Sequence, residues 1–253
     1  LLKKGRETFE LVKRYLGHYN QLIGGNNYDE TGRSFKFDNL LNVMRTGLPS
    51  SDWVPPLLRY FDRFGYERLL EFLTLLDNQL SSDWIAQYSP TTRIEQMNNI
   101  IRLIESADSA AKVFDEENWT DSHGFDFDDE GFVRNITGKV YGRRFARYLL
   151  LKLDYLYADH SHRMALDYLS VEHVLPQKPK ADSQWRKDFT DEQREKWTHR
   201  LGNLVLITTR KNSSQGNRDY SDKKANYFGK RITTCPNSLR VLNSNEQWTP
   251  PEL

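Results

Sequence analysis

The sequence has only one cysteine, Cys235, and no long apolar run. One cysteine excludes a disulfide within the chain and any zinc site built from several thiolates. The absence of about 18 to 20 consecutive apolar residues argues against a membrane-spanning helix. The first residues, Leu1 to Gly5, lack the apolar stretch of a secretory signal and an initiator methionine. We therefore expect a cytoplasmic protein without membrane association, and a chain that is part of a longer protein.

The net charge is small over the whole chain but not in every segment. The net charge of the 253 residues is only +1, yet residues 172–231 contain 14 Lys and Arg against 8 Asp and Glu. Residues 1–171 contain 21 against 25, so the positive charge is concentrated in one later segment. Such a segment attracts polyanions, although a chance excess on a solvated surface gives the same count.

The first part of the chain has the apolar spacing of α-helices. It shows in residues 9–23, which end at a Gly-Gly pair, and again in 37–44, 54–64, 66–80 and 94–104. Residues 115–130 are acidic, with no Lys or Arg, and form an exposed connection in this interpretation. We place a helical linker or bundle domain at 1–115 and a second domain at 116–253.

Two short strands and a helix are predicted in the second domain, after a helix at residues 143–157. The first strand includes Val171-Glu172-His173-Val174 and stops at Pro176. A loop of about 25 residues follows, with Trp185, Phe189 and Trp197 as expected anchors. Residues 201–207 predict the second strand, and a helix is expected from Asp219 to Phe228. This order predicts a strand–strand–helix core at about 170–230.

The residue types in this core suit phosphodiester cleavage. The neutral imidazole of His173 can take a proton from water near pH 7. A hard cation, Mg²⁺ or Mn²⁺, would stabilise the crowded phosphorane and the leaving oxygen, and the amide oxygen of Asn212 and the carboxylate of Glu172 suit such an ion. Asn203 lies at a turn, where its side chain can bond the facing backbone and hold the His173 strand.

Several points stay open at the level of sequence. Adjacent strand residues face opposite sides, so Glu172 either joins His173 at the ion or only supports the site. Asn217 competes with Asn212 as the ligand, and His199 either bonds a phosphate or is an ordinary surface histidine. The basic residues placed to contact DNA phosphates are Arg210, Lys211, Arg218, Lys223 and Lys224.

Residues 130–248 resemble the C-terminal HNH domain of GmrSD-type modification-dependent restriction enzymes. The matching pieces, in order, are the helix Arg147–Leu153, Glu172-His173-Val174-Leu175-Pro176-Gln177, Trp185, Leu201-Gly202-Asn203-Leu204-Val205-Leu206, Asn212, Asn217, the Lys223–Lys224 pair and Trp248. The resemblance implies an α+β, predominantly α-helical protein in which a helical array precedes a small ββα-metal (HNH, or His-Me finger) nuclease core.

The resemblance also implies a function in host defence. It predicts a Mg²⁺-dependent endonuclease that nicks or cuts modified foreign DNA, such as phage DNA, in restriction. It further implies an N-terminal nucleotide-hydrolysing sensor domain in the same longer chain. The alternative from another class is a DNA- or partner-binding module with a degenerate nuclease fold. A ribonuclease is a third reading, because the expected chemistry does not need to distinguish DNA from RNA.

Overall fold

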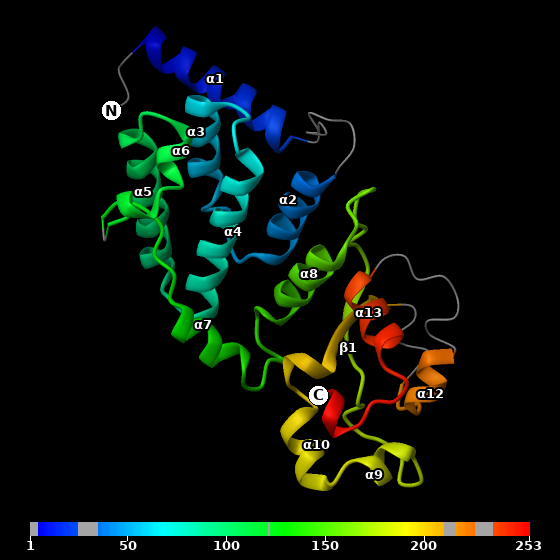
Figure 1. Cartoon of the computed structure of the whole chain (residues 1–253). Helices are drawn as coiled ribbons and strands as arrows, with labels where there is room; N and C mark the ends of the chain where they lie inside the picture. Colours follow the sequence, from blue (N-terminus) through cyan, green and yellow to red (C-terminus); the bar gives the residue numbers. More distant parts are fainter. Residues whose placement is uncertain (1–4, 25–34, 121, 210–215, 226–234) are drawn as a thin grey trace. The chain divides into compact units, whose positions relative to one another are not determined.

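The computed structural model describes residues 5–24, 35–120, 122–209, 216–225 and 235–253. The chain divides into two compact units (Figure 1). The helical unit comprises residues 1–132 and 160–163, and the hairpin unit comprises 133–159 and 164–253. The division falls within α7 (Asp129–Ile136), whereas the boundary expected from sequence lies in the acidic segment before it.

The helical unit is built from α1 (Arg6–Leu22), α2 (Lys36–Gly47), α3 (Val54–Phe64), α4 (Leu69–Ile85), α5 (Pro90–Ser106), α6 (Ala110–Val113) and the 3₁₀ turn η1 (Glu116–Asn118). α3 packs against α1, α4 and α5, and α4 also packs against α2 and α5. Fully buried Leu57, Tyr60, Phe72 and Leu76 belong to its core, where the Tyr60 and Phe72 rings stack at 4.0 Å. The helices predicted for residues 9–104 are confirmed.

The hairpin unit contains α8 (Ala146–Tyr157), β1 (Leu169–His173), α9 (Gln184–Asp188), α10 (Asp191–Trp197), η2 (Leu201–Asn203), β2 (Leu204–Thr208), α12 (Tyr220–Lys223), α13 (Pro236–Ser244) and η4 (Pro250–Glu252). β1 and β2 are antiparallel, with Glu172 opposite Val205 and His173 opposite Leu204. α8 and α13 both pack against β2, which is buried along most of its length. The described fold is thus largely helical with a small sheet, which confirms the α+β class.

The connection between the strands differs from the prediction. It is not a plain loop, because it contains α9 and α10. Thr190 caps the start of α10 with a capping box. Its hydroxyl accepts from the Gln193 backbone N–H, and the Gln193 side-chain oxygen accepts from the Thr190 backbone N–H. Trp185 and Phe189 are buried as expected, but Trp197 is only partly buried and lies outside the main apolar cluster. The recorded contacts of Trp197 are instead with the Lys196 and Arg200 cations.

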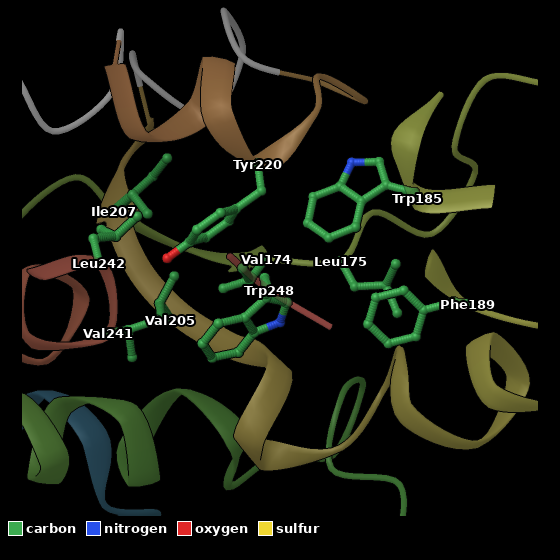
Figure 2. Close-up of a cluster of buried hydrophobic side chains, with 10 residues drawn as sticks. All are labelled: Val174, Leu175, Trp185, Phe189, Val205, Ile207, Tyr220, Val241, Leu242 and Trp248. Atoms are coloured by element: carbon green, nitrogen blue, oxygen red, sulfur yellow. The ribbon is translucent and has the colours of Figure 1, made fainter. Parts of the chain in front are cut away.

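One apolar cluster holds the parts of the hairpin unit together (Figure 2). Trp185 reaches it from α9, Tyr220 from α12 and Trp248 from the segment after α13. The Tyr220 and Trp248 rings stack at 6.0 Å, and the Trp185 indole N–H donates to the Arg218 carbonyl at 2.9 Å. The remaining members are Val174, Leu175, Phe189, Val205, Ile207, Val241 and Leu242. This core fixes the segment after β1 against β2 and α12.

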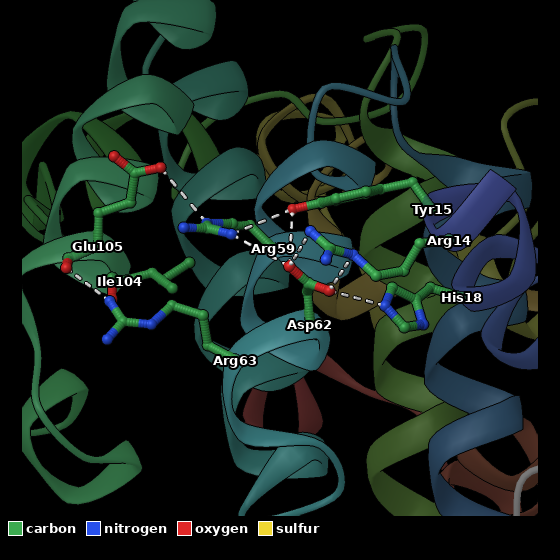
Figure 3. Close-up of polar contacts among 8 residues, drawn as sticks. All are labelled: Arg14, Tyr15, His18, Arg59, Asp62, Arg63, Ile104 and Glu105. Atoms are coloured by element: carbon green, nitrogen blue, oxygen red, sulfur yellow. Dashed lines mark hydrogen bonds and ion pairs between the residues drawn. The ribbon is translucent and has the colours of Figure 1, made fainter. Parts of the chain in front are cut away.

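A polar cluster attaches α1 to α3 in the helical unit (Figure 3). The Asp62 carboxylate of α3 meets Arg14, Tyr15 and His18 of α1, with His18 Nε2 at 3.0 Å. Burial alone would raise the pKa of Asp62, but the His18 hydrogen bond and the Arg14 charge outweigh it and hold the pKa below its ordinary value. Polar contacts thus tether α1, while Phe9 on its outer face is 77% exposed.

Candidate active site

The end of β1 directs two neighbouring side chains to different surroundings. The Glu172 carboxylate meets the Lys223 ammonium, and these two residues line a small hollow with Val174, Val205 and Tyr220. The imidazole of His173 instead contacts Tyr141 and His199. This alternation is what a strand imposes on adjacent residues. The described geometry therefore favours the alternative in which Glu172 supports the site through Lys223 and does not share an ion with His173.

His173 is only 5% exposed and is held by three neighbours. Its Nε2 lies 3.2 Å from His199 Nδ1, and its Nδ1 lies 3.4 Å from Gln177 Nε2. The edge of the Tyr141 ring packs on the imidazole with centroids 4.3 Å apart, and Tyr141 also stacks on His199. Four groups from three separate segments of the hairpin unit therefore converge at the end of β1.

Both histidines of this cluster favour the neutral form. Burial, with the nearby His199 and Lys223, lowers the pKa of His173 to about 4. Burial and the Lys139 charge lower the pKa of His199 as well. With the Gln177 amide N–H directed at Nδ1 of His173, the consistent tautomer has its proton on Nε2, which then donates to His199. In that tautomer His173 presents an unprotonated Nδ1.

Lys223 of α12 is buried, with 4% exposure, and points back at the hairpin. Its ammonium donates to Glu172 Oε1 at 2.9 Å and to the carbonyls of His173 and Val174 at 2.7 and 3.1 Å. Burial lowers its pKa, and the Glu172 carboxylate acts in the opposite direction. An ammonium has three N–H donors, so this arrangement engages all of them. In this structure Lys223 ties α12 to β1 instead of reaching toward solvent and a phosphate.

Asn203 is fully buried and bonds the segment that follows His173. Its Oδ1 accepts from the Leu175 N–H at 2.7 Å, and its Nδ2 donates to the carbonyls of Leu175 and Thr198, both at 2.9 Å. The Trp248 indole N–H donates to the same Oδ1 at 3.3 Å. Asn203 therefore has the bracing contacts that its place at the turn predicts, and its buried amide acts on His173 through the backbone.

The other predicted phosphate and metal residues fall into two groups. Lys224 lies 2.9 Å from Glu246 and donates to the Asn245 carbonyl, while Arg218 is exposed. Arg210, Lys211 and Asn212 lie outside the described residues. Within the described ranges, no group of three or more His, Cys, Asp and Glu side chains forms a metal site. The described residues alone do not make a complete ion site, and the Asn212 assignment stays a prediction.

Sequence reasoning did not single out two members of the cluster, Tyr141 and His199, as partners of His173. His199 appears there only as an open alternative, although it lies just four residues before Asn203, whose turn returns the chain to β1. Tyr141 carries no sequence signal at all. It is brought to the site because its backbone N–H and that of Val140 donate to the His199 carbonyl at 3.0 and 2.9 Å.

These features define a small α+β domain with a buried, neutral histidine at the end of a β-hairpin, an arrangement suited to hydrolases that use a general base. Comparison with known families identifies it further. The model for GmrSD restriction endonucleases, C-terminal domain, matches residues 126–253. The chain belongs to this family, which assigns it a nuclease role in restriction. No curated protein matches the chain, and no helix in the described residues has the length and apolar character needed to cross a bilayer.

Proposed function

We propose that this protein is an HNH (His-Me finger) endonuclease that nicks or cleaves modified foreign DNA in host defence, with Mg²⁺ or Mn²⁺ as cofactor. The observation that carries the proposal is the place of His173 at the end of the hairpin, where burial lowers the pKa of its imidazole and its Nε2 lies 3.2 Å from His199 Nδ1. Family membership supplies the nuclease and restriction role. The strand–strand–helix order β1, β2, α12 agrees with a ββα core.

In this proposal Nδ1 of His173 takes the proton from the attacking water. The Gln177 amide N–H occupies the position from which a water O–H would donate, and Gln177 itself is exposed, so its side chain can give way. Once protonated, the imidazolium still donates through Nε2 to His199 Nδ1. The Tyr141 ring keeps the plane of the imidazole fixed. A positioned base of this kind typically contributes about 10² to 10⁴ in rate.

The expected metal ion would supply positive charge to the phosphorane and the leaving oxygen. Glu172 does not fit this task in the described geometry, because its carboxylate is bonded to Lys223 away from the imidazole. We therefore assign the ion to the amide oxygen of Asn212, with the exposed Asn217 as the alternative, and give Glu172 a positioning role through Lys223. The modification sensor would be a nucleotide-hydrolysing domain of the same longer chain, acting in the cytoplasm.

Plasmid nicking tests the proposal. Supercoiled DNA is incubated with the wild type, His173→Ala and His123→Ala, each with Mg²⁺, Mn²⁺ or EDTA. We expect metal-dependent nicking by the wild type and by the control, whose histidine lies in the helical unit, and a loss of at least about 100-fold in His173→Ala. DNA binding should persist in that variant.

Four outcomes would replace the proposal. Nicking that is unchanged in His173→Ala, or equal in EDTA, rejects a metal-assisted His173 mechanism. Binding of DNA without cleavage under any condition favours the non-catalytic module, which the deep burial of His173 also fits. Preferred cleavage of RNA in a parallel assay would redirect the activity to a ribonuclease.

A further inference from the structure

Three basic residues lie on the two backbone segments that meet at His199. The backbones of Lys139 and Arg200 form an isolated antiparallel β-bridge. The Lys139 charge also lowers the pKa of the His199 imidazole. Lys196 lies in the last turn of α10, and Arg200 lies just after the helix. Both cations contact the ring of Trp197, the last residue of α10. Lys139 and Lys196 are exposed and Arg200 is partly exposed. We call Lys139, Lys196 and Arg200 the α10 basic edge.

The side chain of Trp197 orders two of these cations. Lys196 Nζ lies 4.6 Å and the Arg200 guanidinium 4.9 Å from the centre of the indole ring. Cations at such distances are attracted by the ring quadrupole. Arg200 also donates from Nε to the Lys196 carbonyl at 3.1 Å, which leaves its outer N–H groups for another acceptor. A partly buried tryptophan thus holds two positive charges together at the surface.

Within the described residues, the edge lacks the acidic partners that four other basic residues of the hairpin unit have. Arg186 and Arg194 pair with Asp191, Lys223 with Glu172, and Lys224 with Glu246. No carboxylate in the described ranges pairs with Lys139, Lys196 or Arg200. Like charges gathered without a counter-charge repel one another, and a polyanion relieves that repulsion. Of the five residues first expected to contact phosphates, Lys223 and Lys224 already pair with carboxylates.

We propose that the α10 basic edge binds the phosphate backbone of the DNA presented to His173. The proposal rests on the proposed nuclease function and adds a substrate-binding surface to it. His199 joins the two, because its ring bonds His173 while its backbone carbonyl accepts from Val140 and Tyr141, which directly follow Lys139. Cations on one strand's phosphates confer affinity without reading the bases, which suits a nuclease with little sequence preference of its own.

Binding of a fluorescent DNA duplex in EDTA, measured by anisotropy over a range of salt concentrations, tests this surface without cleavage. The variant Lys196→Ala/Arg200→Ala is compared with Lys13→Ala/Lys187→Ala, which removes the same charge from exposed lysines elsewhere. We expect the first pair to weaken binding at least about tenfold and to reduce the salt slope by about 2, one unit per lost phosphate contact. The control should stay within about twofold of the wild type.

Charge-preserving Lys196→Arg/Arg200→Lys should retain the affinity, which separates charge from folding. Equal affinities and slopes for the two double-alanine variants would overturn the proposal, as would a wild type that binds no duplex. Tighter binding of an RNA duplex through the same residues would overturn its assignment to DNA. A wild type that binds through the edge but never nicks would reject the nuclease function and leave the binding surface standing.

Discussion

The Lys223 ammonium lies 2.9 Å from the Glu172 carboxylate, and both side chains are withdrawn from solvent, with 5% and 13% exposure. The same ammonium bonds the carbonyls of His173 and Val174. One side chain of α12 thereby fixes the backbone on which the candidate base is mounted. Breaking a buried pair from one side is costly because the remaining charge keeps its desolvation penalty.

Lys223→Met should therefore destabilise the protein strongly. It leaves the Glu172 carboxylate and two carbonyls without a donor, and we expect a loss of about 3 kcal/mol in the free energy of unfolding. Urea denaturation measures it. The matched control is Lys224→Met, whose partner Glu246 is 93% exposed, so its loss should stay below about 1 kcal/mol. Equal losses in the two variants would contradict the buried role of Lys223.

Asn203→Ala should disconnect the backbone after His173 from the turn before β2. The substitution removes one acceptor and two donors that serve buried backbone groups, and we expect about 2 to 4 kcal/mol of destabilisation. Asn243→Ala, at an exposed position of α13, should change stability by less than about 0.5 kcal/mol. Thermal unfolding compares the two. If Asn203→Ala lowers the unfolding temperature no more than Asn243→Ala does, Asn203 does not brace the backbone after His173.

His173 should make stability depend on pH below neutrality. Its pKa is lowered from 6.5 to about 4 in the folded protein, so the unfolded chain takes up a proton first as the pH falls. Relative to His173→Gln, the free energy of unfolding of the wild type should fall by up to about 3 kcal/mol as the pH drops from 6.5 to 4. The difference between the two unfolding curves isolates this residue from other groups. A constant difference over that range would mean that His173 is not desolvated.

Asp154 of α8 should act in the opposite direction. Its Oδ1 accepts from the Asn237 N–H at the start of α13, and burial raises its pKa to about 7. The folded state then holds a proton that the unfolded state has released, so this contribution is lost as the pH rises from about 4 through 7. Asp154→Asn keeps the acceptor without the charge. Relative to this variant, the free energy of unfolding of the wild type should fall by up to about 4 kcal/mol between pH 4 and pH 8.

Urea unfolding at a series of pH values measures this difference. Asp182→Asn, at an exposed position of the hairpin unit, provides the comparison curve. A wild type that gains stability relative to Asp154→Asn as the pH rises would contradict the assignment.

The sequence predicts the strands well because their signals are local. Pro176 stops the first strand, and the Gly202-Asn203 turn precedes the second, so the existence of both strands follows from neighbours along the chain. The helices of the inter-strand connection were missed, although Thr190 and Gln193 carry a readable capping-box signal.

The direction of side chains was harder to predict. Lys223 and Lys224 look equivalent in the sequence, yet successive residues of a helix point about 100° apart, so one is buried and the other remains near solvent. Which of the two turns inward depends on the placement of α12 by the Tyr220 contacts. Tyr141 and His199 meet His173 through long-range packing, which no local pattern in a single sequence reports.

The alternation at the end of β1 also determines how the hairpin can be assembled. Sliding β1 by one residue along β2 would exchange the surroundings of its last two side chains. The imidazole would then face a buried ammonium, and the carboxylate would face a pair of uncharged rings. Both misplacements are electrostatically unfavourable, so the side-chain surroundings disfavour a slip of one residue. Insertions in the long connection after Pro176 would leave that register intact, whereas one extra residue within the strand would not.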